Sequence, residues 1–288
     1  MSMFTIDGVQ IYYEVTGTGF PLVFSHEFGG DHRSWENQVR HFARRYMVIT
    51  YNARGYPPSD VPNSVGSYSQ NIAVNDLYGL LSHLEIKSAY IAGLSMGGTV
   101  ALNFGFEHPE ISRALIISGA GTGSTDTEKW RTETLALADR FESEGLRGMG
   151  NEYAGSRARQ SFHRKDPRGW GEFRDALLDH DSNGAALTFR GFQAPRPSVF
   201  EQKEKMRNLK VPTLIICGDE DEPCIEPSIF MRRNIPRSGL AMFPQSGHTP
   251  NLEDPALFNR TIDDFLTAVE ADKWAERDLS AASGFVSP

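Results

Sequence analysis

The sequence has little of what would tie a chain to a membrane, a nucleic acid or an oxidising compartment. We find no apolar run long enough to cross a bilayer and no charged-then-apolar leader. The two cysteines, Cys217 and Cys224, lie close together in a chain of 288 residues, which favours free thiols over a disulfide. A formal net charge of −8 argues against nucleic acid or an anionic membrane as partner. We therefore expect a cytoplasmic protein that acts on a small molecule; a homodimer is compatible with these numbers.

The rest of the composition, 39% hydrophobic and 23% charged, is that of an ordinary globular protein. Short apolar runs alternate with segments of helical spacing, which predicts an α/β fold with a mostly parallel sheet and helices on both faces. Strands are expected at residues 4–6, 9–15, 21–24, 46–50, 89–92, 114–118, 211–217 and 240–243, and helices near 34–44, 71–84, 99–104, 228–234 and 254–269. An Asp7-Gly8 turn predicts that the first two strands form a hairpin.

The alternation stops between residues 122 and 205. This segment has no clear apolar strand, and helical stretches such as 127–145 are interleaved with glycine- and charge-rich turns. We expect residues 1–121 and 206–270 to form the core, residues 122–205 to form a helical cap over the carboxyl edge of the sheet, and residues 271–288 to form a loosely held tail.

The strongest local signal is the sequence GLSMGG at residues 93–98. A strand pattern precedes it and a helical pattern follows it, so Ser95 stands on a tight turn between the two. Small residues at positions 93 and 97 suit such a turn because a Cβ there would clash. This nucleophile elbow predicts an exposed, reactive serine hydroxyl beside a helix N-terminus.

A serine hydroxyl needs a base to accept its proton and an acid to orient that base. The candidate base is His248, between the last predicted strand and the last helix. The candidate acid lies in the loop after the 211–217 strand, where Asp221 is favoured, Asp219 competes and Glu220 stands behind them. The order serine, acid, histidine is that of the α/β-hydrolase elbow.

On these motifs, together with the loop at residues 51–56, the sequence closely resembles the α/β-hydrolase family from about residue 4 to about residue 269. The resemblance implies an α/β-hydrolase fold with Ser95 as nucleophile, His248 as base and Asp221 as acid, the acid falling on the fourth position of a G-x-x-D pattern. It implies neither a cofactor nor a metal. The carboxylate-nucleophile branches of the family, epoxide hydrolases and haloalkane dehalogenases, do not fit a serine at the elbow.

The family also implies an oxyanion hole of two backbone N–H groups. One donor maps to Met96, directly after the nucleophile, and the other to Phe28, after the strand at residues 21–24. Here the chain departs from the family, because Glu27 stands where a glycine is usual. Its carboxylate either reaches the mouth of the pocket and biases substrate choice, or turns to solvent or to a nearby Arg or His. Both interpretations stay open.

The substrate pocket is expected between cap and core. Aromatic residues of the cap would line part of it, with Trp170 and Phe192 as candidates beside Glu27. The cap also contains several arginines that could recognise a carboxylate, and the sequence singles out none of them: Arg157, Arg159, Arg164, Arg168 and Arg190. The neighbours His26, Glu27, Asp31 and His32 offer metal-ligand types without a metal-binding register, so no metal site is expected.

These residues predict a serine hydrolase that cleaves a small, partly apolar carboxylic ester or lactone through an acyl-enzyme. A C–C bond hydrolase of ring-cleavage products is the closest alternative, and a cap arginine facing the pocket would favour it because such substrates are anionic. An amidase or perhydrolase could use the same residues. A small-ligand receptor on the same fold is the alternative outside enzymes, and fold alone does not choose among these.

Overall fold

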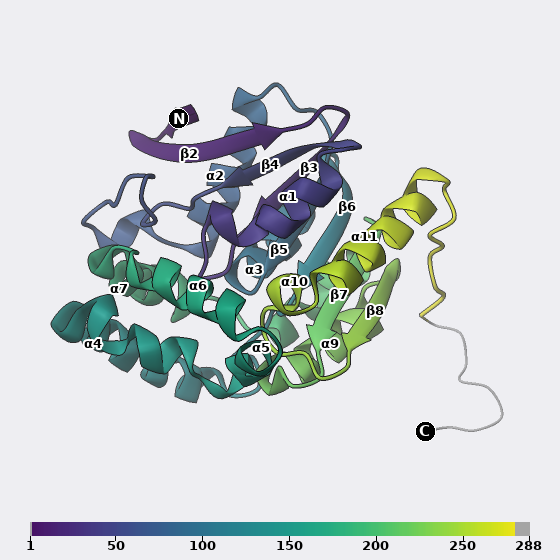
Figure 1. Ribbon diagram of the computed structural model, residues 1–288. Helices are drawn as coiled ribbons and strands as arrows, with labels where there is room; N and C mark the ends of the chain where they lie inside the picture. Colours follow the sequence, from purple (N-terminus) through teal and green to yellow (C-terminus); the bar gives the residue numbers. More distant parts are fainter. Residues whose placement is uncertain (1, 280–288) are drawn as a thin grey trace.

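The computed structural model describes residues 2–279, and its centre is one eight-stranded sheet in the order β1-β2-β4-β3-β5-β6-β7-β8 (Figure 1). The strands are β1 (Ser2–Ile6), β2 (Val9–Thr16), β3 (Phe20–Ser25), β4 (Tyr46–Tyr51), β5 (Ala89–Leu94), β6 (Ser112–Ser118), β7 (Thr213–Gly218) and β8 (Ser238–Phe243). Only β1 and β2 pair antiparallel with their neighbours. Asp7 and Gly8 both have positive φ in the turn between them, which confirms the predicted hairpin.

Helices cover both faces of the sheet, as the alternating pattern predicts. On one face, α1 (Glu36–Phe42) and α11 (Pro255–Glu270) bury aromatic and aliphatic side chains against the strands. On the other face pack α2 (Gln70–His83), α3 (Met96–Glu107) and α9 (Glu222–Asn234). Two short helices, α8 (Lys203–Asn208) and α10 (Pro250–Glu253), precede β7 and α11. The fold is an α/β-hydrolase fold, as the resemblance implies.

Between β6 and β7 the chain forms a separate group of helices, hereafter the inserted helices (residues 122–205). They are α4 (Thr127–Ala154), α5 (Gln160–Lys165), α6 (Pro167–Leu178), α7 (Ser182–Thr188) and a π-helical turn, η4 (Phe189–Gln193). Figure 1 shows them in teal beside the sheet. They contact the loops that follow the carboxyl ends of β3 and β8, through the Phe28–Phe189 ring pair and a hydrogen bond from His248 N to Ala158 O.

Three segments differ from the prediction. Helix α4 does not end at Gly145 but continues beyond it, because this glycine adopts a non-helical φ of 68° that kinks the helix instead of stopping it. Helix α9 begins at Glu222, six residues earlier than expected, since a proline is tolerated in the first turn of a helix. The expected loose tail was wrong for Trp274, which packs on Phe265 and donates to Arg237 O at 2.8 Å. The tail from residue 280 onward lies outside the described residues.

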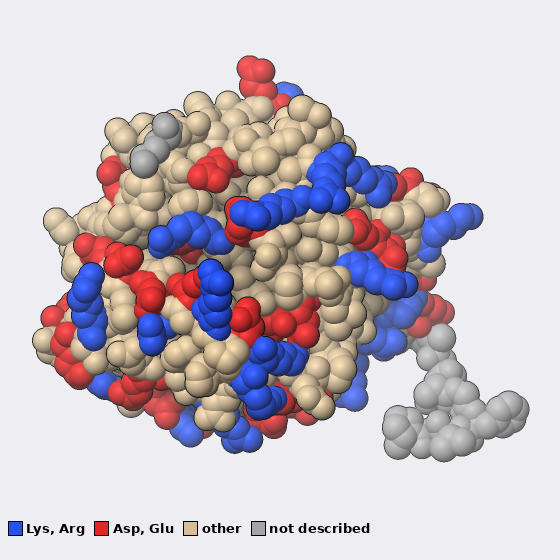
Figure 2. Space-filling view, in the orientation of Figure 1, with Lys and Arg blue, Asp and Glu red and all other residues tan. Residues whose placement is uncertain are grey.

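The structure also bears on two expectations from the sequence, free cysteines and no segment that crosses a membrane. Both Cys217 and Cys224 are free and buried. Within residues 2–279, every helix is too short or too polar to cross a bilayer. On the face drawn in Figure 2, acidic and basic side chains are intermixed. Ion pairs link such groups elsewhere too, as between Arg140 of α4 and Glu144 and Glu152.

The first turn of helix α3 lies so close to the end of β3 that a residue with a side chain would not fit between them. A Cβ on Gly97 would lie 2.0 Å from Ser25 O, and one on Gly93 would lie 2.1 Å from Gly97 O. Backbone atoms occupy both places and cannot give way as a flexible side chain could. These two glycines are therefore required for packing, as the clash argument predicts.

Substituting Gly97→Ala should lower the free energy of unfolding by roughly 3 kcal/mol, because the new methyl group forces α3 away from β3. Gly171→Ala is the matched control: it lies inside α6, and its Cβ would meet nothing within 4 Å. That variant should gain about 0.5–1 kcal/mol from helix propensity. Urea denaturation of both variants and the wild type measures the difference; equal stability of the two variants would contradict the packing argument.

Candidate active site

Ser95 occupies the turn between β5 and α3 with a strained backbone. Its φ of 56° and ψ of −110° lie outside the regions that a non-glycine residue ordinarily adopts. Its amide donates to Ser118 O at 2.8 Å, and its carbonyl accepts from Thr99 N at 2.9 Å, so the turn is held from both sides. The serine is only half-buried, which leaves its hydroxyl at the carboxyl edge of the sheet.

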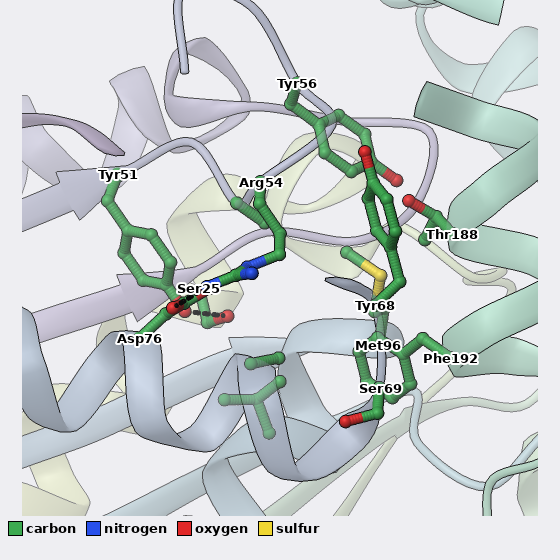
Figure 3. Close-up of a pocket in the computed structure, with 13 residues that line it drawn as sticks. Ser25, Tyr51, Arg54, Tyr56, Tyr68, Ser69, Asp76, Met96, Thr188 and Phe192 are labelled. Carbon is green, nitrogen blue, oxygen red and sulfur yellow. Dashed lines mark hydrogen bonds and ion pairs between the residues drawn. The ribbon is translucent and has the colours of Figure 1, made fainter. Parts of the chain in front are cut away.

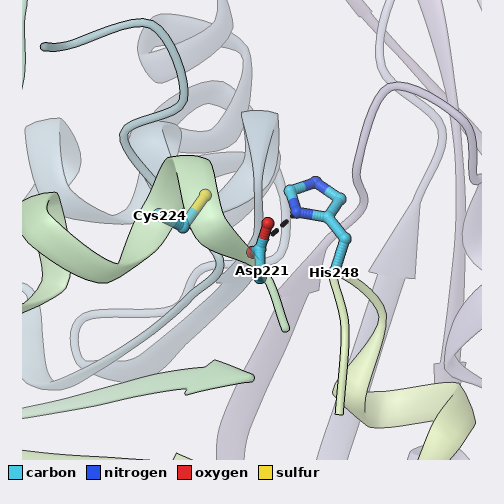
Figure 4. A group of neighbouring side chains, drawn as sticks. All are labelled: Asp221, Cys224 and His248. Atoms are coloured by element: carbon cyan, nitrogen blue, oxygen red, sulfur yellow. Dashed lines mark hydrogen bonds and ion pairs between the residues drawn. The ribbon is translucent and has the colours of Figure 1, made fainter. Parts of the chain in front are cut away.

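His248 and Asp221 face each other from the loops after β8 and β7 (Figure 4). His248 Nδ1 lies 2.8 Å from Asp221 Oδ2, and both side chains are buried. The competing acids lie elsewhere: Asp219 Oδ1 accepts from Ser246 N at 3.3 Å, and Glu220 pairs with Arg164 of the inserted helices. Of the three candidate acids, the structure brings only Asp221 to the histidine.

Cys224, which sequence reasoning did not place here, lies one turn of α9 after Asp221. Ligand atoms of Asp221, Cys224 and His248 all lie within 4.8 Å of one another, a spacing that could hold a metal ion. The chemistry of the donors does not fit one well. Burial raises the pKa of the Cys224 thiol well above its usual value, and the thiol donates to Gly119 O, while Asp221 already occupies His248 Nδ1. The one-turn spacing from Asp221 was the signal that could have found it.

The amides of Met96 and Phe28, the two predicted oxyanion donors, belong to segments that lie against each other. Met96 opens α3, so its N–H is one of the helix-terminal donors without a partner in the helix. Phe28 is a central residue of a turn closed by Gly30 N and Glu27 O at 3.2 Å. The contact of Gly97 with the carbonyls of Ser25 and His26 brings this loop against the start of α3.

Glu27 points inward and pairs with an arginine of the inserted helices. Its Oε2 accepts a hydrogen bond from Arg159 Nη2 and lies 4.0 Å from His248 Nε2. Glu27 and Arg159 are only 1% and 4% exposed, so this is a buried ion pair beside the histidine. The Arg159 guanidinium also stacks over the ring of Tyr153 at 4.6 Å. Arg159 is one of five arginines among which the sequence could not choose.

The charges around His248 act on its pKa in opposite directions. Burial lowers it, because the charged imidazolium loses solvation. The carboxylate of Asp221, through its charge and its hydrogen bond, and that of Glu27 more than offset the burial, while Arg159 opposes them. The net effect raises the pKa of His248 above its usual 6.5.

A small cavity lies behind the elbow, between the core and the inserted helices (Figure 3). Its volume is about 20 Å³, which is room for one or two water molecules. Met96 and Phe192 line it, together with Tyr56, Thr188 and the ion-paired Arg54. Trp170, in contrast, bonds Ala154 O through its indole N–H and packs on His163 and Arg174, all within the inserted helices.

Several known proteins are similar to this protein over most of its length. A 3-oxoadipate enol-lactonase of Acinetobacter baylyi is 27% identical, covering 86% of this chain and 89% of its own. A 2-hydroxymuconate semialdehyde hydrolase of a Pseudomonas species is also 27% identical, covering 92% and 93%. Among solved structures, an esterase of Thermogutta terrifontis superposes with a TM-score of 0.83 at 28% identity, covering 93% and 97%.

The relatives thus include lactonases, C–C bond hydrolases and esterases. The model of the alpha/beta hydrolase fold family matches residues 21–255, and the strained serine and the histidine–aspartate pair lie within that segment. The chain therefore belongs to the α/β-hydrolase fold family and is a hydrolase.

Proposed function

We propose that the protein is a serine hydrolase that cleaves a small, partly apolar carboxylic ester or lactone through an acyl-enzyme. The observation that carries this proposal is the strained, half-buried Ser95 at the same sheet edge as the buried His248–Asp221 pair. A receptor would not need a serine held at a φ of 56° beside a base already oriented by a carboxylate.

In the first half of the reaction, Ser95 Oγ attacks the carbonyl carbon and its proton passes to His248 Nε2. Asp221 keeps Nδ1 protonated, so that Nε2 is the free acceptor, and stabilises the imidazolium that forms. The amides of Met96 and Phe28 donate to the oxyanion. His248 then gives its proton to the leaving alkoxide, and Ser95 is left acylated.

In the second half, a water molecule donates a proton to His248 Nε2 as its oxygen attacks the acyl carbon. The tetrahedral intermediate collapses when His248 returns the proton to Ser95 Oγ, which releases the acid. The ring of Phe28 packs at 4.2 Å on Phe189 and 5.5 Å on Phe141, so apolar side chains gather next to the proposed oxyanion donor. These rings favour a partly apolar acyl group.

Hydrolysis of a C–C bond in an anionic ring-cleavage product is the second candidate, because Arg159 faces the site from the inserted helices. The Pseudomonas relative is named a 2-hydroxymuconate semialdehyde hydrolase. Against it, Glu27 already takes up the charge of Arg159, so an anionic substrate would have to displace a buried carboxylate. We therefore rank a neutral ester or lactone first.

The nucleophile is tested with p-nitrophenyl esters from acetate to octanoate. Wild type should hydrolyse a subset with a chain-length optimum, and Ser95→Ala should lower kcat at least about 1000-fold because no acyl-enzyme can form. The rate is measured from the release of p-nitrophenol, whose anion absorbs at roughly 405 nm; this release needs the proton transfers of His248. Equal rates in both proteins would sink the proposal.

The acid is tested by two isosteric substitutions. Asp221→Asn should lower kcat about 10³–10⁴-fold, because an amide stabilises the wrong tautomer of His248 and does not balance its charge. Asp219→Asn keeps the acceptor for Ser246 N and should change kcat less than about threefold. Steady-state kinetics on one ester compares them, and the opposite ranking would assign the acid to Asp219.

The pH dependence follows from the sign of the His248 shift. Only the neutral imidazole accepts the proton of Ser95, so kcat/KM should rise as pH rises through the pKa of His248. Because that pKa is raised, the midpoint of the acidic limb should lie above 6.5. A neutral ester keeps substrate ionisation out of the profile; a midpoint below 6.5 would contradict the electrostatics described above.

A further inference from the structure

Glu27 has an unsatisfied oxygen in the centre of the site. Its Oε2 bonds Arg159, but among residues 2–279 no group donates a hydrogen bond to its Oε1, which is buried. A buried carboxylate oxygen without a donor is costly, so the site requires a donor that the chain itself does not supply. Water and the O–H or N–H groups of a substrate are the donors that can enter.

The position of Glu27 relative to His248 favours water over a substrate group as this donor. Glu27 Oε2 lies 4.0 Å from His248 Nε2, the atom that accepts a proton in each half of the proposed reaction. Two acceptors at this distance can share one water molecule, which would lie about 2.8 Å from each and donate one O–H to His248 and the other to the Glu27 carboxylate. Glu27 directly precedes Phe28, the proposed second oxyanion donor, so a water held between Glu27 and His248 would lie on the side of the site where the acyl group is expected.

We propose that Glu27 is a positioning residue that binds the hydrolytic water of the deacylation step. The inference rests on the proposed acyl-enzyme function. One O–H of the water donates to His248 Nε2 and the other donates to the Glu27 carboxylate, which aims a lone pair at the ester carbonyl.

The step balances without any further reactant. The C–O bond from water to the acyl carbon forms, one proton of the water moves to His248 Nε2, and the bond from the acyl carbon to Ser95 Oγ breaks as that proton passes to Oγ. The second proton stays on the water oxygen, which becomes the hydroxyl of the product acid. Glu27 takes up no proton in this step; it orients the nucleophile and keeps its contact with Arg159.

Arg159 fixes the carboxylate in this place. Although burial disfavours its charge, Glu27 raises the pKa of Arg159, so the guanidinium stays charged. Arg159 belongs to a 3₁₀ turn (Arg157–Arg159) whose Ala158 carbonyl accepts the amide of His248 at 2.8 Å. The carboxylate and the histidine are thus positioned by the same short turn of the inserted helices.

The decisive experiment compares Glu27→Gln with wild type in water and in water containing methanol. The amide can still accept from Arg159, but it presents an N–H donor where the water needs an acceptor. Methanol has a single O–H, which it donates to His248, and needs no second acceptor. We expect kcat for hydrolysis of a p-nitrophenyl ester to fall about 10- to 100-fold, with the methyl ester to acid product ratio rising about tenfold.

Intact-mass spectrometry of quenched reactions completes the test. Glu27→Gln should accumulate the acyl adduct on Ser95, and kcat/KM, which reports acylation, should change less than about threefold. Lys165→Met, which removes a different ion pair between inserted helices and core (Lys165–Asp254), controls for loosened packing and should leave the product ratio unchanged. Thermal unfolding checks that both variants are folded.

The outcomes separate the two proposals. If wild type forms an adduct on Ser95 but Glu27→Gln leaves the ratio of methyl ester to acid unchanged, the proposed role of Glu27 is overturned. The proposal of a serine hydrolase then still stands. A fall in kcat/KM without adduct accumulation assigns Glu27 to substrate binding instead. Ester turnover without any Ser95 adduct under single-turnover conditions overturns both.

Discussion

The close approach of two backbones is the constraint on which the site depends. Where α3 begins, Gly97 lies against the carbonyls of Ser25 and His26, with no room for a methyl group. That contact fixes the angle between β5 and α3, and the chain can turn through it only if Ser95 takes a positive φ. It also brings the start of α3 against the loop that carries Phe28. One packing contact thus sets the serine, both candidate oxyanion donors and Glu27 relative to one another.

Features that depend on a few consecutive residues could be predicted from the sequence. The elbow at residues 93–98 combines strand, glycine and helix signals locally, and the loops of Asp221 and His248 each follow a strand at the same sheet edge. Parallel strands end at one edge, so their following loops converge. The eight strands and the hairpin at Asp7-Gly8 were also predictable, because each strand depends on a short apolar pattern in the local sequence.

Features that depend on distant partners were not readable. Glu27 and Arg159 are 132 residues apart, and nothing in either local pattern points to the other. Trp274 falls in the segment expected to be a loosely held tail, yet it packs on Gly239, where only a glycine leaves space for the indole. Helix α9 begins six residues before the expected start, with a proline in its first turn and a second one inside it, at position 227. In each case tertiary contacts outweigh a local signal.

The hydrogen bond from His248 N to Ala158 O has a consequence for how such a protein can change its specificity. A Cβ on Gly247 would also lie 2.2 Å from that carbonyl, so the turn at residues 157–159 is fitted to the histidine loop on two sides. Gaining or losing a residue there would move His248, the proposed base. The length of this short turn is therefore coupled directly to the position of His248, so a change of specificity that keeps the histidine in place must leave the turn intact.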